Sequence, residues 1–232
     1  VISIGLAAMS KFVFIIIAPF MISALMPGKR LKYVIALLSV MTVLYLPYVG
    51  AGKGLFSTLF HFGTQYHFND SVHFLIFCLS IGSPLVSKII TVAIFGAVLL
   101  YLYKKHLNTH FVGQDINRND SIIRFAFLSI GAFLILTPTL HPWYLTWIVP
   151  FLCFNKNRAW LILTGTVVFY YFMNHELFSK MILYNNEWVW KEVHWLKLPE
   201  YLPFYGLLIY GWLKTVLPLR HKATKTNINL AT

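Results

Sequence analysis

Long apolar runs constrain this chain more than any other feature. Several approach the ~20 residues that a helix needs to cross the hydrocarbon core of a bilayer. Of all residues, 58% are hydrophobic and only 11% are charged, too few to cover a soluble core with polar surface. The runs also lack the short alternating segments of an outer-membrane barrel. The sequence therefore predicts an all-α, polytopic transmembrane bundle.

The expected bundle has about seven spans, several of which approach the length that a bilayer requires. They are Ile2–Met26, Tyr33–Val49, Pro84–Tyr103, Ser121–Pro138, a shorter Trp143–Phe154, Ala159–Asn174 and Tyr201–Leu217. Interfacial helices are expected on the outer face. This organisation gives one transmembrane domain over 1–218 and a cytoplasmic tail over 219–232.

The basic residues gather in alternate connections and so indicate the orientation. One set of connections, with adjoining span ends, carries 13 of the 19 lysines and arginines: Lys29, Arg30, Lys32, Lys104, Lys105, Arg118, Arg124, Lys156, Arg158, Lys214, Arg220, Lys222 and Lys225. By the positive-inside rule this set is cytoplasmic in a multi-pass plasma-membrane protein, and residue 141 is on the outer side. Such a distribution accounts for the +12 net charge through membrane topology, with no nucleic-acid partner.

The first segment lacks the features of a signal peptide. Ile2–Met26 has no basic start, contains Lys11 in mid-run and has no small-residue cleavage pattern. Because the chain also begins with Val1, we expect it to be part of a longer protein that continues on the amino-terminal side.

His141 is the most informative polar residue, within the run Thr137-Pro138-Thr139-Leu140-His141-Pro142-Trp143-Tyr144. The two prolines preclude regular helix between them, and irregular backbone at membrane depth must line a cavity or be buried in protein. We expect His141 to face an outer cavity, where imidazole can donate to a phosphate oxygen or exchange a proton. Trp143 and Tyr144 then contact a sugar or a lipid. In the alternative interpretation, the aromatic residues form an interfacial belt and His141 caps a helix end.

The connection Gly50–Ser83 is the second outer element. It contains an expected interfacial helix over Leu55–Phe62, followed by His67-Phe68-Asn69-Asp70-Ser71. Asp70 or Ser71 is expected to cap a helix that begins near Val72. A role for Asp70 as a catalytic base is the alternative.

No metal site is expected. His61, His67 and His73 recur every six residues, a spacing that matches neither a helical face nor a compact ligand cluster. Cys78 and Cys153 lie in separate apolar runs, which supports neither a zinc site nor a disulfide framework.

Lys11 has no acidic residue near it in its own segment. An ammonium in an apolar interior needs a cavity, a carboxylate or an anionic ligand, so Lys11 is a candidate phosphate contact. The alternative is that its side chain snorkels to the outer interface. A third outer segment, His175–Glu200, mixes charged and tryptophan residues and is expected to form an interfacial helix over the cavity. A carbohydrate-binding lid is the alternative.

The run from Thr137 to Tyr144, followed by Trp147 and Pro150, resembles the signature region of integral-membrane glycosyltransferases of the GT-C type. The nearest group is glycosyltransferase family 87, the polyprenyl-phosphate-mannose-dependent mannosyltransferases. Ser10-Lys11-Phe12 leading to Pro19, and His67-Phe68-Asn69-Asp70, are similar to the same family. The likeness covers nearly the whole chain, but only the carboxy-terminal part of such an enzyme.

The resemblance implies inverting transfer of a sugar, mannose by family, from a polyprenyl-phosphate donor to a lipid or glycan acceptor on the outer face. It implies no cofactor and no nucleotide-sugar site. His141 would contact the donor phosphate or acceptor, Lys11 the phosphate, and Trp143 and Tyr144 the sugar or lipid pocket, with Asn69 and Asp70 also among the substrate-binding residues. The family's general base is an aspartate in the first outer loop, and no acidic residue precedes Lys11 here. The base is therefore expected upstream, and the chain alone is expected to be inactive.

Two other classes remain open. A transporter or flippase of a lipid-linked or anionic substrate would use Lys11 and the broken helix at His141 as a midplane site. A non-catalytic membrane assembly subunit would tolerate substitution of both residues.

Overall fold

The computed structural model describes residues 2–25, 27–54, 56–57, 60, 63, 67–111, 118–174, 177, 180–184 and 187–229. The expected interfacial helix over Leu55–Phe62 lies largely outside these residues. The protein is mostly helical and divides into two compact units, Val1–Asn155 and Lys156–Thr232, each described by itself. The all-α expectation is confirmed at this level.

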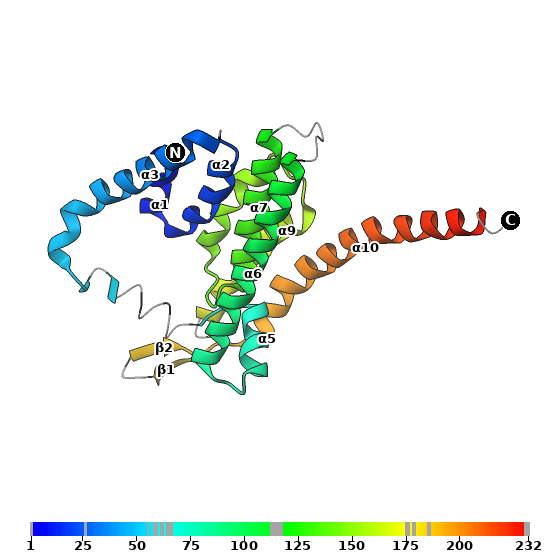
Figure 1. Ribbon diagram of the computed structural model, residues 1–232. Helices are drawn as coiled ribbons and strands as arrows, with labels where there is room; N and C mark the ends of the chain where they lie inside the picture. The colour runs from blue at the N-terminus through cyan, green and yellow to red at the C-terminus, as the bar shows by residue number, and fades with distance from the viewer. Residues whose placement is uncertain are drawn as a thin grey trace. The chain divides into compact units, whose positions relative to one another are not determined.

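The first expected span is not one helix. In its place are α1 (Ile2–Ser10), the 3-10 helix η1 (Phe12–Ile17) and α2 (Ala18–Ser23), with an extended residue at Lys11 between the first two. After the 3-10 turn η2 (Pro27–Lys29), α3 (Arg30–Tyr45) runs into η3 (Leu46–Ala51) and packs back against α1 (Figure 1).

Helices α1 and α3 approach closely at Gly5. A Cβ built on Gly5 would lie 2.8 Å from Val40 Cγ1. Because overpacking forces backbone or rotamer shifts, we expect Gly5→Ala to lower the free energy of unfolding by about 1–3 kcal/mol. Val40→Ala should recover much of that loss in the double variant. Denaturant titration of the four proteins in one detergent measures this coupling, and purely additive effects of the two changes would contradict the contact.

Helices α5 (Val72–Leu79), α6 (Pro84–Phe111) and α7 (Arg118–Leu136) form the rest of the first unit's helical body (Figure 1). His73 Nδ1 lies 2.9 Å from Thr91 Oγ1 and joins α5 to α6. Phe20, Leu102 and Phe125 pack α2 against α6 and α7, with the Phe20 and Phe125 rings stacked at 6.0 Å. The expected span Trp143–Phe154 is divided into η4 (Pro142–Trp147) and the short α8 (Val149–Leu152).

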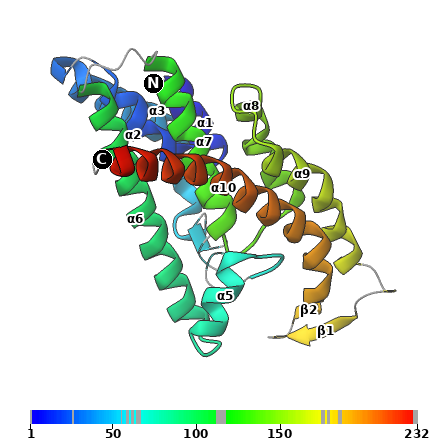
Figure 2. The same cartoon turned by 90° about the vertical axis from the view of Figure 1, so that its right-hand side faces the viewer.

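The second unit contains α9 (Arg158–Thr166), η5 (Val167–Asn174), η6 (His194–Leu196) and α10 (Lys197–Asn229). The side chain of Asn157 caps α9 by accepting the N–H groups of Ala159 and Trp160. Helices α9 and α10 run side by side (Figure 2), with the rings of Trp160 and Phe204 4.9 Å apart. Helix α10 continues past residue 218, where the transmembrane domain was expected to end.

The prediction of an interfacial helix within His175–Glu200 is wrong for part of that range. Strand β1 (Met181–Tyr184) pairs antiparallel with β2 (Glu187–Trp190), with Met181 opposite Trp190. Aromatic and β-branched residues favour extended strands, and this preference outweighs the charge pattern that suggested a helix. After the hairpin in the chain, Lys197 Nζ forms a 2.8 Å ion pair with Glu192.

Among the residues that the structure describes, two helical stretches are long and apolar enough to cross a membrane by length and composition, Arg30–Ala51 and Pro84–Asn108. Phe12–Ser23 and Arg158–Met173 are apolar but shorter. The bundle of about seven spans is therefore not confirmed, because 3-10 turns and proline breaks divide several of the apolar runs that suggested it.

Candidate functional site

Two segments that the sequence singled out separately meet in the first unit. The N–H of Phe68 donates to the carbonyl oxygen of Pro138 at 3.0 Å, and the N–H of Leu140 donates to Phe68 O at 3.1 Å. These bonds form an isolated parallel bridge between Phe68 and Thr139. Buried backbone that a proline has removed from a helix needs other partners, and each segment supplies them to the other.

Asn69 and Asp70 are buried at this junction, with 0% and 1% of their surface exposed. Asn69 has a φ of +52°, a left-handed conformation that asparagine tolerates better than most residues. Its Nδ2 donates to Leu140 O at 3.3 Å, a link between residues 71 positions apart. The junction thus holds both segments in one polar, water-poor environment.

The helix expected near Val72 does begin there, and Ser71 occupies its N-cap position. The hydroxyl of Ser71 makes no capping bond, however, and instead donates to Ile135 O at 3.3 Å, near the end of α7. Ser71 therefore occupies the N-cap position but does not cap the helix with its side chain, so that expectation is wrong. Tertiary contact with the last turn of α7 takes precedence over local capping.

The junction also contains buried polar atoms that could hydrogen-bond to a ligand. Within the part of the chain that the structure describes, the buried Oγ1 of Thr139 and Nδ1 of His67 have no hydrogen-bond partner. Most buried polar atoms are paired, so two such atoms in the two joined segments are consistent with a binding site for a polar ligand.

His141 begins η4 with extended backbone, φ −88° and ψ 149°, as expected for a residue before proline. Its side chain makes no capping hydrogen bond, which contradicts the helix-cap alternative. The imidazole is stacked on Trp143 with ring centroids 4.4 Å apart and meets Tyr144 edge-on at 5.3 Å. His141 and Tyr144 are half-buried, whereas Trp143 is 51% exposed.

Burial lowers the pKa of His141 below its ordinary value of 6.5 because the charged form is desolvated. The imidazole is consequently neutral near pH 7, with one ring nitrogen as donor and the other as acceptor. In this state it can hydrogen-bond a phosphate oxygen or a sugar hydroxyl.

A chain of aromatic contacts leads from His141 towards Lys11. Tyr144 stacks on Trp147 at 4.4 Å, and Trp147 meets the ring of Phe14 at 6.4 Å. Phe14 lies one turn after Lys11 and donates its N–H to Lys11 O at 3.1 Å. Lys11 is exposed and its backbone is extended, so the helix expected to continue through this position is broken there. Lys11 forms no ion pair among the described residues.

His106 was missed in the sequence. It is fully buried, with Nε2 3.1 Å from Ser23 Oγ and Nδ1 3.2 Å from Ser121 Oγ. Because the Ser23 hydroxyl donates to Phe20 O at 2.8 Å, it accepts from Nε2–H, which leaves Nδ1 to accept from Ser121. A histidine in the last turns of an apolar helix was the signal, and small hydroxyl residues on two other helices complete the cluster.

No known protein family, curated protein or solved structure matches this chain.

Proposed function

We propose that this chain carries the donor-binding part of a GT-C-type membrane glycosyltransferase, which transfers a sugar from a polyprenyl-phosphate donor to a lipid or glycan acceptor. The observation that supports it most is the backbone pairing of Phe68 with Thr139. That pairing joins the two outer segments that resemble the family, and it places Asn69, Asp70 and the His141 motif around one junction.

The chemistry of the residues suits a sugar phosphate. A neutral imidazole and buried amide and hydroxyl groups can bind phosphate and sugar oxygens, and the exposed face of Trp143 can stack on a sugar ring. In transfer from a lipid phosphate, the phosphate is the leaving group, so fixed donors and Lys11 would stabilise its developing charge. The general base is proposed to lie upstream, as the resemblance implies.

A plasma-membrane location with about seven spans is part of the proposal. It is supported by the exposure of the apolar stretches: only 6% of the apolar window in Arg30–Ala51 and 17% of that in Pro84–Asn108 is buried in the protein. A core helix of a soluble protein would be mostly buried, whereas lipid can cover exposed Leu31, Ile35 and Leu38.

Donor binding tests the proposal on the chain itself. Nanodiscs containing the chain should retain radiolabelled polyprenyl-phosphate-mannose, and a nucleotide-linked mannose should not compete. Membranes from cells that carry the gene should transfer the label to lipid or glycan, and membranes from a deletion strain should not. Retention of the nucleotide sugar, or equal transfer by both membranes, would contradict the proposal.

One observation favours a transporter as the second candidate, namely the broken helix with a lysine at the break. Label that crosses a sealed vesicle without appearing in any product would support transport. Product formed without net movement of donor would exclude it.

Lys11 gives a prediction that separates its two interpretations. We expect Lys11→Met to weaken donor binding about five- to tenfold, since a charged hydrogen bond to phosphate contributes ~1.5–3 kcal/mol less the solvation it replaces. Lys11→Arg should retain part of the affinity. Lys53→Met, at another exposed lysine, is the matched control. Unchanged affinity in Lys11→Met would favour snorkelling.

A further inference from the structure

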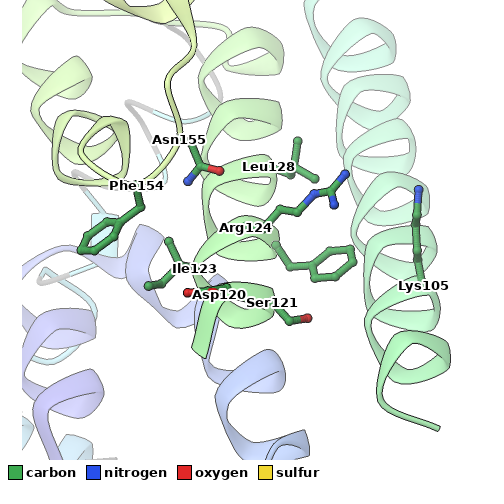
Figure 3. Close-up of a pocket in the computed structure, with 9 residues that line it drawn as sticks. Lys105, Asp120, Ser121, Ile123, Arg124, Leu128, Phe154 and Asn155 are labelled. Atoms are coloured by element: carbon green, nitrogen blue, oxygen red, sulfur yellow. The ribbon is translucent and has the colours of Figure 1, made fainter. Parts of the chain in front are cut away.

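A pocket with charged residues in its lining lies in the first unit between α6, α7 and the residues that follow α8. Its volume is about 450 Å³. Lys105 of α6, Arg124 of α7 and Asn155 contribute polar groups, while Leu128 and Phe154 contribute apolar walls (Figure 3). None of these residues belongs to the junction of Phe68 with Thr139.

The positive groups of this pocket come from two helices that are held together. Lys105 and Arg124 are both exposed, and no carboxylate is ion-paired with Arg124 among the described residues. Ser121 lines the pocket and is hydrogen-bonded to the buried ring of His106, next to Lys105 in α6. The two cations are therefore presented from a fixed framework, as anion recognition requires.

The pocket lies at headgroup depth if Pro84–Asn108 crosses a membrane. Lys105 is within one turn of the end of that stretch. It belongs to the basic set of connections, which faces the anionic cytoplasmic leaflet by the positive-inside rule. The apolar side chains beside the cations are open, with Phe154 70% and Leu128 38% exposed. An amphiphile can place its phosphate on the cations and its glycerol and upper chains on this wall.

Asp120 narrows the choice of ligand. It also lines the pocket, and Figure 3 shows its side chain on the side away from the Arg124 guanidinium. A carboxylate repels a phosphate dianion but accepts hydrogen bonds from hydroxyl groups. A ligand with one negative phosphodiester and free hydroxyls satisfies both ends of the pocket.

We infer that this pocket binds the headgroup of an anionic glycerophospholipid that bears free hydroxyls, with the phosphodiester on Lys105 and Arg124 and a hydroxyl on Asp120. The inference rests on the proposed membrane location and is independent of sugar transfer. Phosphatidylglycerol is the probe of this chemistry.

The test uses the chain in phosphatidylcholine nanodiscs doped with phosphatidylglycerol or phosphatidic acid, with bound lipid counted by native mass spectrometry. Wild type should retain phosphatidylglycerol preferentially. Arg124→Gln and Lys105→Gln should each lower its retention about fivefold, as expected for one basic group at a membrane surface. Lys104→Gln is the matched control, because it removes the same charge from the neighbouring exposed position, outside the pocket. Asp120→Asn should reduce the preference over phosphatidic acid.

Five outcomes would overturn the inference. Equal losses in Lys104→Gln and Arg124→Gln would indicate nonspecific surface attraction. Competition by inorganic phosphate would indicate a free-anion site, and preferential retention of phosphatidic acid would exclude the role of Asp120. If Arg124→Gln fails to fold, a photoactivatable phosphatidylglycerol on wild type decides, and crosslinks that avoid Leu128 and Phe154 would reject the pocket. A chain that does not float with membranes refutes the membrane location itself, whatever the outcome for sugar transfer.

Discussion

Asn69→Val is expected to lower the free energy of unfolding by about 2–3 kcal/mol and to abolish most donor binding. A β-branched residue at a φ of +52° is strained by ~1–2 kcal/mol, and loss of the buried amide bond to Leu140 O adds ~1 kcal/mol. Both effects act on the junction between the Phe68 segment and the segment that leads into His141. Denaturant titration in detergent measures the first effect and donor retention in nanodiscs the second.

Asn69→Gly is the matched control, since glycine adopts the same backbone without strain but lacks the amide. It should lose only about 1 kcal/mol, the contribution of the hydrogen bond. The N–H of Leu140 donates to Phe68 O at 3.1 Å, so hydrogen exchange at this amide measures directly whether the junction is intact. Wild-type stability in Asn69→Val, with Leu140 still protected, would show that Asn69 does not stabilise the pairing.

Some of the site could be predicted because local covalent geometry determines it. The ring of Pro142 excludes helical geometry at His141 whatever the surroundings, and His141 is indeed extended. The start of α5 at Val72 was likewise expected from the polar residues before it. Uninterrupted apolar runs predicted α3 and α6. These helices could be predicted because a helix satisfies its backbone hydrogen bonds within its own segment.

What could not be predicted depends on contacts distant in sequence. Nothing near Phe68 indicates that it pairs with Thr139, because an isolated bridge has no periodic pattern. The break at Lys11 has no proline or glycine at the break itself, and the turn of η1 packs against α7 by tertiary contact. Ser71 follows the same principle, since its partner Ile135 belongs to another helix.

Donor affinity is expected to rise as the pH falls from about 7.5 to about 5.5, and this rise should disappear in His141→Gln. Burial lowers the pKa of His141, so the free site is neutral at pH 7. A bound phosphodiester favours the imidazolium and raises that pKa towards or above its ordinary value. Binding is then coupled to proton uptake, and by linkage the affinity increases as protons become available. The phosphodiester itself keeps its charge over this range, so the donor contributes no slope.

Stability of the free chain should change in the opposite direction. The pKa of His141 is lower in the folded than in the unfolded chain. The contribution of His141 to the free energy of unfolding is therefore fully present above the unfolded pKa of 6.5, and it is lost as the pH falls from there towards the folded pKa. A merely structural histidine would give this loss without any pH dependence of donor affinity.

His141→Ala should in addition reduce sugar transfer by at least about tenfold while membrane insertion is retained, a typical cost for one phosphate-binding group. Parallel pH profiles of donor affinity in wild type and His141→Gln would remove His141 from the phosphate site and leave Lys11 as its candidate.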